Sequence, residues 1–132
     1  MSQKMFIGHG KHQVSIQGDI ICIKLIGAFN EYDFQAISAK VKAQVSALDG
    51  RAFCMLIDHS ELLGATPEAY QELDKLNTWL NEQNMRAKAI VINLSTVLDT
   101  IKSRTPAIST QNIKVFECVN SARQWLDAFA QQ

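Results

Sequence analysis

The sequence predicts a single α/β domain over residues 1–132, a mixed and mostly parallel five-stranded sheet with helices on both faces, in the order β-β-α-β-α-β-α-β-α. Short apolar runs alternate with stretches whose apolar residues recur every three or four positions, which is typical of strands alternating with helices. Gly18-Asp19 separates the first two apolar runs and favours a two-residue hairpin. A chain of 132 residues has the usual length of one domain.

The first two strands are expected to be antiparallel neighbours joined by this hairpin. In residues 12–17, Val14 and Ile16 alternate with polar residues, which is typical of a strand with one buried face. Residues 20–26 are apolar on both faces, so the second strand is expected to be central. The first strand then lies at an edge of the sheet.

A helix is predicted to follow, because Asn30 can cap it and Asp33, three residues on, gives a weak form of the capping box. Its apolar residues form one buried stripe. They are Phe34, Ile37, Val41, Val45 and Leu48. Asp49-Gly50 ends the helix, since glycine accepts the left-handed conformation of a C-terminal cap.

The third strand is expected at residues 52–57 and ends at Asp58. A loop is expected from there to the second helix, which Thr66-Pro67-Glu68 begins. Leu73, Leu76 and Leu80 should face the core. In open α/β sheets, ligands bind outside the carboxyl ends of the strands, so the loop 58–67 is the place to look for function.

Three more elements complete the predicted order. A fourth strand is expected at residues 87–93, a fifth at residues 112–116, and between them a short helix that ends before Pro106. Ser95 or Thr96 caps this short helix, which carries Val97, Leu98 and Ile101. Asn120 is expected to cap the last helix, whose core side consists of Ala122, Trp125, Leu126 and Phe129.

Composition excludes several functions. Lysine plus arginine and aspartate plus glutamate number 13 each, so the basic excess of a nucleic-acid-binding protein is missing.

Cys22, Cys54 and Cys118 are isolated, and the first two are expected to be structural thiols inside strands. An odd number of cysteines without a signal peptide indicates a cytoplasmic protein. The apolar runs are too short for a transmembrane segment.

Asp58, His59 and Ser60 have the residue types of a catalytic triad. Successive residues of an extended chain point to opposite sides, however, so a proton cannot pass along this row. We expect Asp58 to accept backbone N–H groups in an Asx turn and His59 to be a solvated loop residue, with a position beside a ligand as the alternative. The sequence therefore predicts no catalytic residues, no metal site and no cofactor.

Three segments carry a resemblance to STAS-like domains, in particular to the SpoIIAA-like group of small bacterial proteins. Residues 25–34 resemble the family's step from strand into first helix, and residues 55–58 resemble its third strand, which ends in aspartate. Val115-Phe116-Glu117 with Ala122-x-x-Trp125-Leu126 resembles its last strand and helix. The resemblance extends over residues 14–129. Together with the lack of catalytic groups in the sequence, it favours a non-catalytic binding or regulatory module.

The resemblance also directs attention to Thr66. STAS domains of the anti-sigma-factor antagonist type have an Asp-Ser-Ser-Gly-like motif at the start of the second helix, where a partner kinase phosphorylates a serine. This chain has Gly64-Ala65-Thr66-Pro67-Glu68 there, with Thr66 as the hydroxyl at the helix start. We expect Thr66 to be a helix cap, with a role as phosphoacceptor as the weaker alternative.

The leading hypothesis is a binding module that docks a protein partner through the loop 58–67 and the second helix. Its candidate binding residues are Asp58, His59, Ser60, Leu63 and Thr66. The alternative is a pocket for a small apolar ligand or lipid between the second and third helices and the sheet. An enzyme with Asp58 and His59 as acid–base groups is the least favoured reading. An exposed first strand also allows a homodimer by edge pairing.

Overall fold

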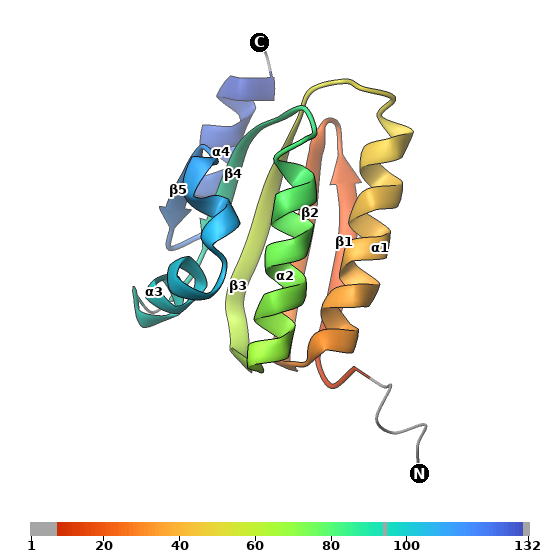
Figure 1. Ribbon diagram of the computed structural model, residues 1–132. Helices are drawn as coiled ribbons and strands as arrows, with labels where there is room; N and C mark the ends of the chain where they lie inside the picture. The colour runs from red at the N-terminus through yellow and green to blue at the C-terminus, as the bar shows by residue number, and fades with distance from the viewer. Residues whose placement is uncertain (1–7, 94, 131–132) are drawn as a thin grey trace.

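The computed structural model describes residues 8–93 and 95–130. Its sheet has five strands that lie in sequence order, β1-β2-β3-β4-β5 (Figure 1). The hairpin strands β1 (Lys11–Gln17) and β2 (Ile20–Phe29) are antiparallel, and every other neighbouring pair is parallel. The predicted fold class, with β1 at an edge and an interior β2, is confirmed.

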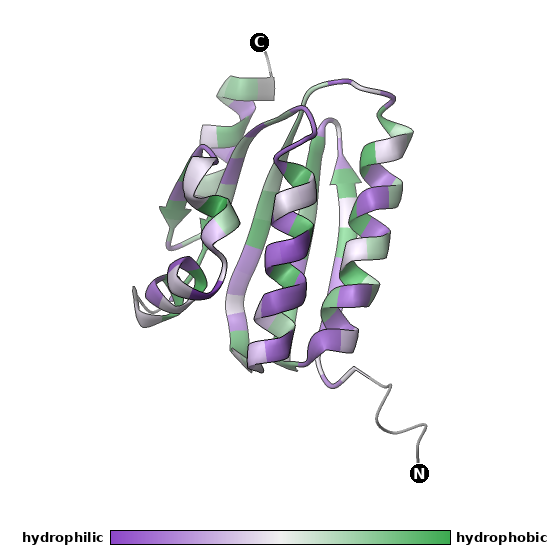
Figure 2. Cartoon of the chain, in the orientation of Figure 1, coloured by the Kyte–Doolittle hydropathy of each residue, from purple (hydrophilic) through white to green (hydrophobic). Residues whose placement is uncertain are grey.

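The strands and helices alternate after the hairpin. They are α1 (Glu31–Ala47), β3 (Phe53–Ala65), α2 (Pro67–Leu80), β4 (Met85–Val91), α3 (Ser95–Arg104), the 3₁₀ helix η2 (Pro106–Thr110), β5 (Ile113–Phe116) and α4 (Val119–Ala130). Helices α1 and α2 cover one face of the sheet, and α4 covers the other. Helix α3 and η2 pack beside α2 and β5. Hydrophobic residues predominate in the central strands, whereas the helices mix both kinds (Figure 2).

Capping residues define the start of α1 as predicted. The Asn30 side chain accepts the Asp33 N–H, and the Asp33 carboxylate accepts the Asn30 N–H at 2.8 Å. The same carboxylate accepts the backbone N–H groups of His9 at 3.0 Å and Gly10 at 3.3 Å. Asp33 therefore ties the chain before β1 to the helix start, and the expected α1 stripe is buried throughout.

Several element boundaries differ from the prediction, among them those of α4 and β4. Asn120 is not the cap of α4, because the helix begins one residue earlier, at Val119, and the Cys118 carbonyl accepts the Ala122 N–H. Strand β4 begins at Met85 and ends at Val91, since Phe53 and Cys54 pair with Met85 and Ala87. Ser95 was expected to cap α3, but its side chain lies outside the described part of the chain. Residues 1–7 also lie outside it.

The helices that the structure describes are too short or too polar to cross a membrane.

Candidate functional site

Strand β3 is much longer than its neighbour β4, and this difference creates the candidate site. The last pair between them is Asp58 with Val91, whereas β3 remains paired with β2 as far as Phe29 and Ala65. The segment expected to be a loop, residues 58–65, is therefore strand. The prediction was wrong because the long β2 offers backbone partners to the end of β3.

Two register shifts fit this extended end of β3 to β2, one between Lys24 and Ile26 and one between Gly27 and Ala28. Bulges of this kind redirect side chains and are frequent beside functional sites. At the second shift, Leu62 and Gly64 pair with β2 and Leu63 has no partner there. Leu63 is 84% exposed, the highest value among the large hydrophobic residues that the structure describes.

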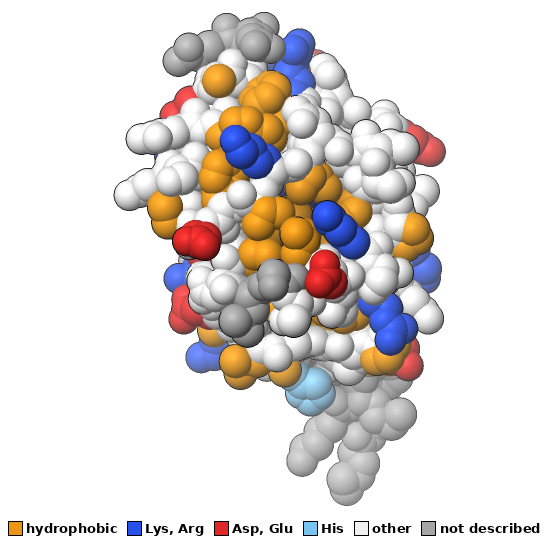
Figure 3. All heavy atoms as spheres, turned by 90° about the vertical axis from the view of Figure 1, so that its left-hand side faces the viewer, with side chains coloured by type: hydrophobic (Ala, Val, Ile, Leu, Met, Phe, Trp, Pro, Cys, Tyr) orange, Lys and Arg blue, Asp and Glu red, His pale blue; other side chains and the backbone are white. Residues whose placement is uncertain are grey.

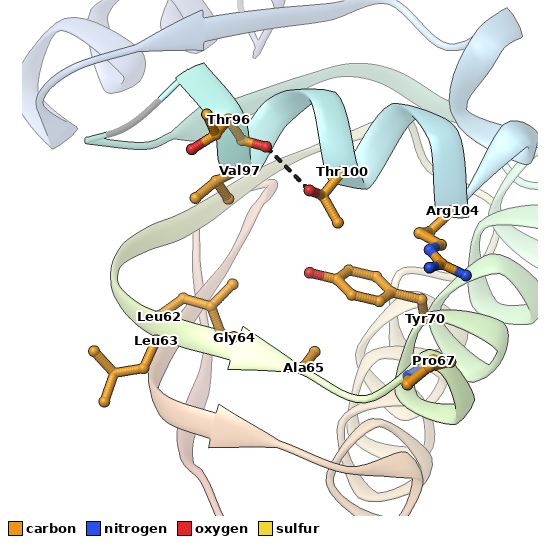
Figure 4. A pocket seen from close by; sticks show the side chains of 10 residues that line it. All are labelled: Leu62, Leu63, Gly64, Ala65, Pro67, Tyr70, Thr96, Val97, Thr100 and Arg104. Carbon is orange, nitrogen blue, oxygen red and sulfur yellow. Dashed lines mark hydrogen bonds between the residues drawn. The ribbon is translucent and has the colours of Figure 1, made fainter.

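A hollow of about 350 Å³ lies between the end of β3, the start of α2 and α3 (Figure 4). Ten residues line it, namely Leu62, Leu63, Gly64, Ala65, Pro67, Tyr70, Thr96, Val97, Thr100 and Arg104. The Tyr70 ring extends from α2 toward Thr100 on α3, while Leu63 points away from the other side chains. The hollow combines apolar walls with hydroxyl groups and one guanidinium group, a lining suited to recognition.

Thr66 lies at the edge of this hollow, between Ala65 and Pro67. Its Oγ1 accepts the Ala69 N–H at 3.1 Å, so the predicted role as cap of α2 is confirmed. The positive end of the α2 dipole is therefore beside the hollow, where it favours negative charge. A phosphate at Thr66 would meet this favourable potential.

Asp58 and Ser60 hold the chain where β4 ends. The Asp58 carboxylate accepts the Ser60 N–H at 2.9 Å, which is the predicted Asx turn. The Ser60 carbonyl accepts a hydrogen bond from the Asn93 side chain, also at 2.9 Å. Neither side chain lines the 350 Å³ hollow; Asp58 instead lines a smaller one on the α4 side of the sheet, with Cys22 and Arg123.

His59 is buried, contrary to the expectation of a solvated loop histidine. Only 6% of the residue is exposed, because residue 59 is still strand and its side chain faces α1 and α2. Burial, and then the nearby charge of Lys88, lower the pKa of His59 to about 4. Asp58 and His59 thus lie on opposite faces of β3, and the arrangement gives no route for a proton from one to the other.

The candidate binding residues named from the sequence do not include Tyr70, Thr100 and Arg104, which line the hollow. Tyr70 is one helical turn after Thr66, so its position near the start of α2 could have been read from the sequence. Burial raises the pKa of its phenol, while the charge of Arg104 acts in the opposite direction. Thr100 and Arg104 lie on α3, and no sequence pattern fixes where that helix packs.

The described residues contain no group of three histidine, cysteine or acidic side chains that could hold a metal ion. Another hollow, of about 320 Å³, lies between α3, η2 and β5, where Leu98, Ile108 and Val115 form part of its wall. Hydrophobic side chains gather on this side of the molecule, with a few charged ones among them (Figure 3).

The SpoIIAA-like family model matches residues 20–127, and the chain belongs to this family. A comparison with curated proteins found no match. Among solved structures, an uncharacterized DUF3478-family protein with a SpoIIAA-like fold from Shewanella loihica PV-4 is 18% identical, with a TM-score of 0.67, over 91% of this chain and 95% of that chain.

Two further structures share the fold. An anti-sigma factor antagonist from Mycobacterium paratuberculosis is 13% identical with a TM-score of 0.64, over 90% of this chain and 95% of that one. The unphosphorylated anti-sigma factor antagonist SpoIIAA is 10% identical with a TM-score of 0.62, over 90% of this chain and 97% of that one. At these identities the likeness establishes the fold alone.

Proposed function

We propose that this SpoIIAA-like protein is a non-catalytic regulatory module that docks a protein partner through the end of β3, residues 62–65, and the first turns of α2. The observation that carries the proposal is Leu63, a large hydrophobic side chain 84% exposed beside a hollow of about 350 Å³. A single exposed leucine is ordinary, but one next to a hollow with apolar walls suits a partner's hydrophobic anchor.

Membership of the family supports this proposal. Two structures with the same fold are named anti-sigma factor antagonists, a name that describes action on another protein. The site also has hydroxyl groups, a guanidinium group and a helix N-terminus, which can bind polar groups of a partner, and it lacks a nucleophile paired with a base.

Affinity capture from a lysate of the native host tests the proposal. Leu63→Asp places a charge at the centre of the proposed contact and should abolish capture of the partner that the unchanged protein retains. Ile16→Asp is the matched control, because Ile16 is the other exposed large hydrophobic residue of the described chain and lies on β1, away from the site. Equal capture by Leu63→Asp and the unchanged protein would contradict the proposal.

Thr66 is the position where such docking could be regulated. Its hydroxyl already caps α2, and a phosphate in its place would retain acceptor oxygens at the positive end of the helix dipole. Intact mass under denaturing conditions, followed by peptide mapping, shows whether protein from the native host carries a phosphate at Thr66. In the capture experiment, Thr66→Glu tests the effect of negative charge, with Thr78→Glu on the exposed side of α2 as control.

A second candidate function is binding of a small apolar ligand or lipid in the same hollow. The observation that favours it is the wall formed by Leu62, Ala65 and Val97, together with a volume within the usual range of ligand sites. Native mass spectrometry should then show bound mass that is lost on denaturation. Val97→Trp should remove this mass by filling the 350 Å³ hollow. Leu98 lines the 320 Å³ hollow instead, so Leu98→Trp should leave the bound mass unchanged.

A further inference from the structure

An internal cavity lies between the sheet and helices α1 and α2, away from the proposed docking site. Its volume is about 30 Å³, enough for one or two particles of the size of water. Nine of its lining residues are hydrophobic: Ile23, Leu25, Phe34, Ile37, Met55, Ile57, Leu73, Leu76 and Leu80. The other three are polar, namely His59, Asn77 and Lys88.

Lys88 is buried in β4 without a negative partner. Only 4% of the residue is exposed, and its Nζ donates to the Asn77 Oδ1. The salt bridges of the described chain do not involve Lys88, and no acidic side chain among the described residues lines the cavity. A buried ammonium group is costly unless an opposite charge accompanies it.

His59 has an unused polar atom in the same place. Its Nδ1 is buried and has no hydrogen-bond partner among the described residues. A neutral imidazole can carry its proton on either nitrogen, so Nδ1 can act as a donor. The cavity is thus bordered by a positive charge and by a second potential donor, both nine-tenths or more buried.

We propose that this cavity binds one small monovalent anion of about the size of chloride, held by the Lys88 ammonium group and the His59 Nδ1–H. The ion would supply the negative charge that Lys88 lacks and the partner that His59 Nδ1 lacks. A water molecule could form the hydrogen bonds but would leave the charge uncompensated. Larger anions such as sulfate or gluconate exceed the volume of the cavity.

The titratable groups set the pH dependence of this site. Lys88 and His59 are the titratable residues that line the cavity, and Asp58 acts on His59 from the opposite face of β3. Burial lowers the pKa of Lys88 to about 7. Burial, and then the charge of Lys88, lower the pKa of His59 to about 4. Lysine is therefore charged and histidine neutral at pH 6, whereas both are neutral at pH 9.

Anion affinity should follow the charged fraction of Lys88. This fraction falls from about nine-tenths at pH 6 to about one-hundredth at pH 9, so affinity should weaken on the order of a hundredfold. Binding to the folded state raises its stability in proportion to the logarithm of ligand concentration. Bromide should therefore raise the thermal midpoint at pH 6, relative to gluconate at equal ionic strength, and should have little effect at pH 9.

Two measurements decide the proposal. Crystals grown in sodium bromide at pH 6 should show an anomalous difference peak in the cavity, in contact with Lys88 Nζ; a peak absent from the cavity would overturn the proposal. The bromide effect on the midpoint should disappear in Lys88→Met, and an equal effect in this variant would also overturn it. Should Lys88→Met fail to fold, diffraction from the unchanged protein still decides.

Discussion

Lys88 in β4 donates from its Nζ to the Oδ1 of Asn77, a residue on the sheet-facing side of α2. Asn77 Oδ1 also accepts from the Gln111 side chain at 3.2 Å, and Gln111 donates in turn to Asn81 at 2.9 Å. A polar row therefore runs from the core to the surface beneath α2. Because Lys88 is the charged end of this row, the stability of the fold should depend on its protonation.

Stability is predicted to rise as the pH increases from about 7 toward 10. Burial lowers the pKa of Lys88 from 10.5 to about 7, so between these values the unfolded chain holds a proton that the folded chain lacks. The free energy of unfolding therefore increases with pH across this window, by several kcal/mol at most. Urea unfolding at pH 7 and pH 9 in sodium gluconate, which excludes a small anion, measures the change.

Lys88→Met is the matched variant for this prediction. Methionine fills similar space without a charge, so the variant should be more stable at pH 7, by about 1 kcal/mol or more, and its stability should change less between pH 7 and pH 9. Lys75→Met, at an exposed position on α2, should leave the pH dependence as it is. The same slope in Lys88→Met as in the unchanged protein would show that another group causes it.

The low pKa of His59 should cause a second pH dependence of stability, below pH 7. Burial, and then Lys88, lower the pKa of His59 from 6.5 to about 4, so the unfolded chain binds a proton in this window before the folded chain does. The histidine therefore reduces stability as the pH falls from 6.5 to 4. Between pH 7 and pH 4.5, the free energy of unfolding of His59→Leu should fall by about 2–3 kcal/mol less than that of the unchanged protein. Urea unfolding of both proteins at the two pH values measures the difference.

The sequence predicted those parts of the fold that depend on local pattern. The Asn30–Asp33 capping box, the buried stripe of α1 and the Thr66 cap follow from residue types at fixed spacing, and each is present. The Gly18-Asp19 hairpin and the Asp58 Asx turn follow in the same way. These features need only neighbouring residues, which is why sequence alone could predict them.

The site was predicted less well, because it depends on partners far apart in the sequence. Residues 58–65 have polar and small residues typical of a loop, but the long β2 keeps them in the sheet. The change from loop to strand buries His59 and brings it to the cavity that Lys88 lines. Nothing in the local sequence around Lys88 shows that Asn77 will face it, so the buried polar row could not be foreseen.

Asp33 is predicted to be one of the most sensitive positions outside the apolar core. Its carboxylate accepts three backbone N–H groups, from His9, Gly10 and Asn30. Asp33→Ala removes the carboxylate half of the capping box and leaves these donors without their acceptor, so we expect a loss of about 2–3 kcal/mol. Glu31→Ala, in the same helical turn, is the control and should change stability by less than about 0.5 kcal/mol. Urea unfolding at pH 7 compares the two.

Cys118 and Cys54 are predicted to differ in reactivity. Cys118 is exposed, and hydrogen bonds from the side chain and backbone of Ser121 lower the pKa of its thiol. Cys54 is buried in β3, and burial raises the pKa of its thiol. Because the thiolate is the reactive form, iodoacetamide at pH 7.5 should label Cys118 first and Cys54 only when the chain unfolds.

Ser121→Ala tests the physical cause of this difference. The Cys118 Sγ lies 3.2 Å from the Ser121 Oγ, and removal of the hydroxyl takes away one hydrogen bond that stabilises the thiolate. Alkylation of Cys118 should then slow by about two- to fivefold, as followed by peptide mass spectrometry over time, while Cys54 remains protected. Ser103→Ala, on α3, should leave the rate unchanged. A Cys118 rate that does not respond to Ser121→Ala would mean that exposure alone makes this thiol reactive.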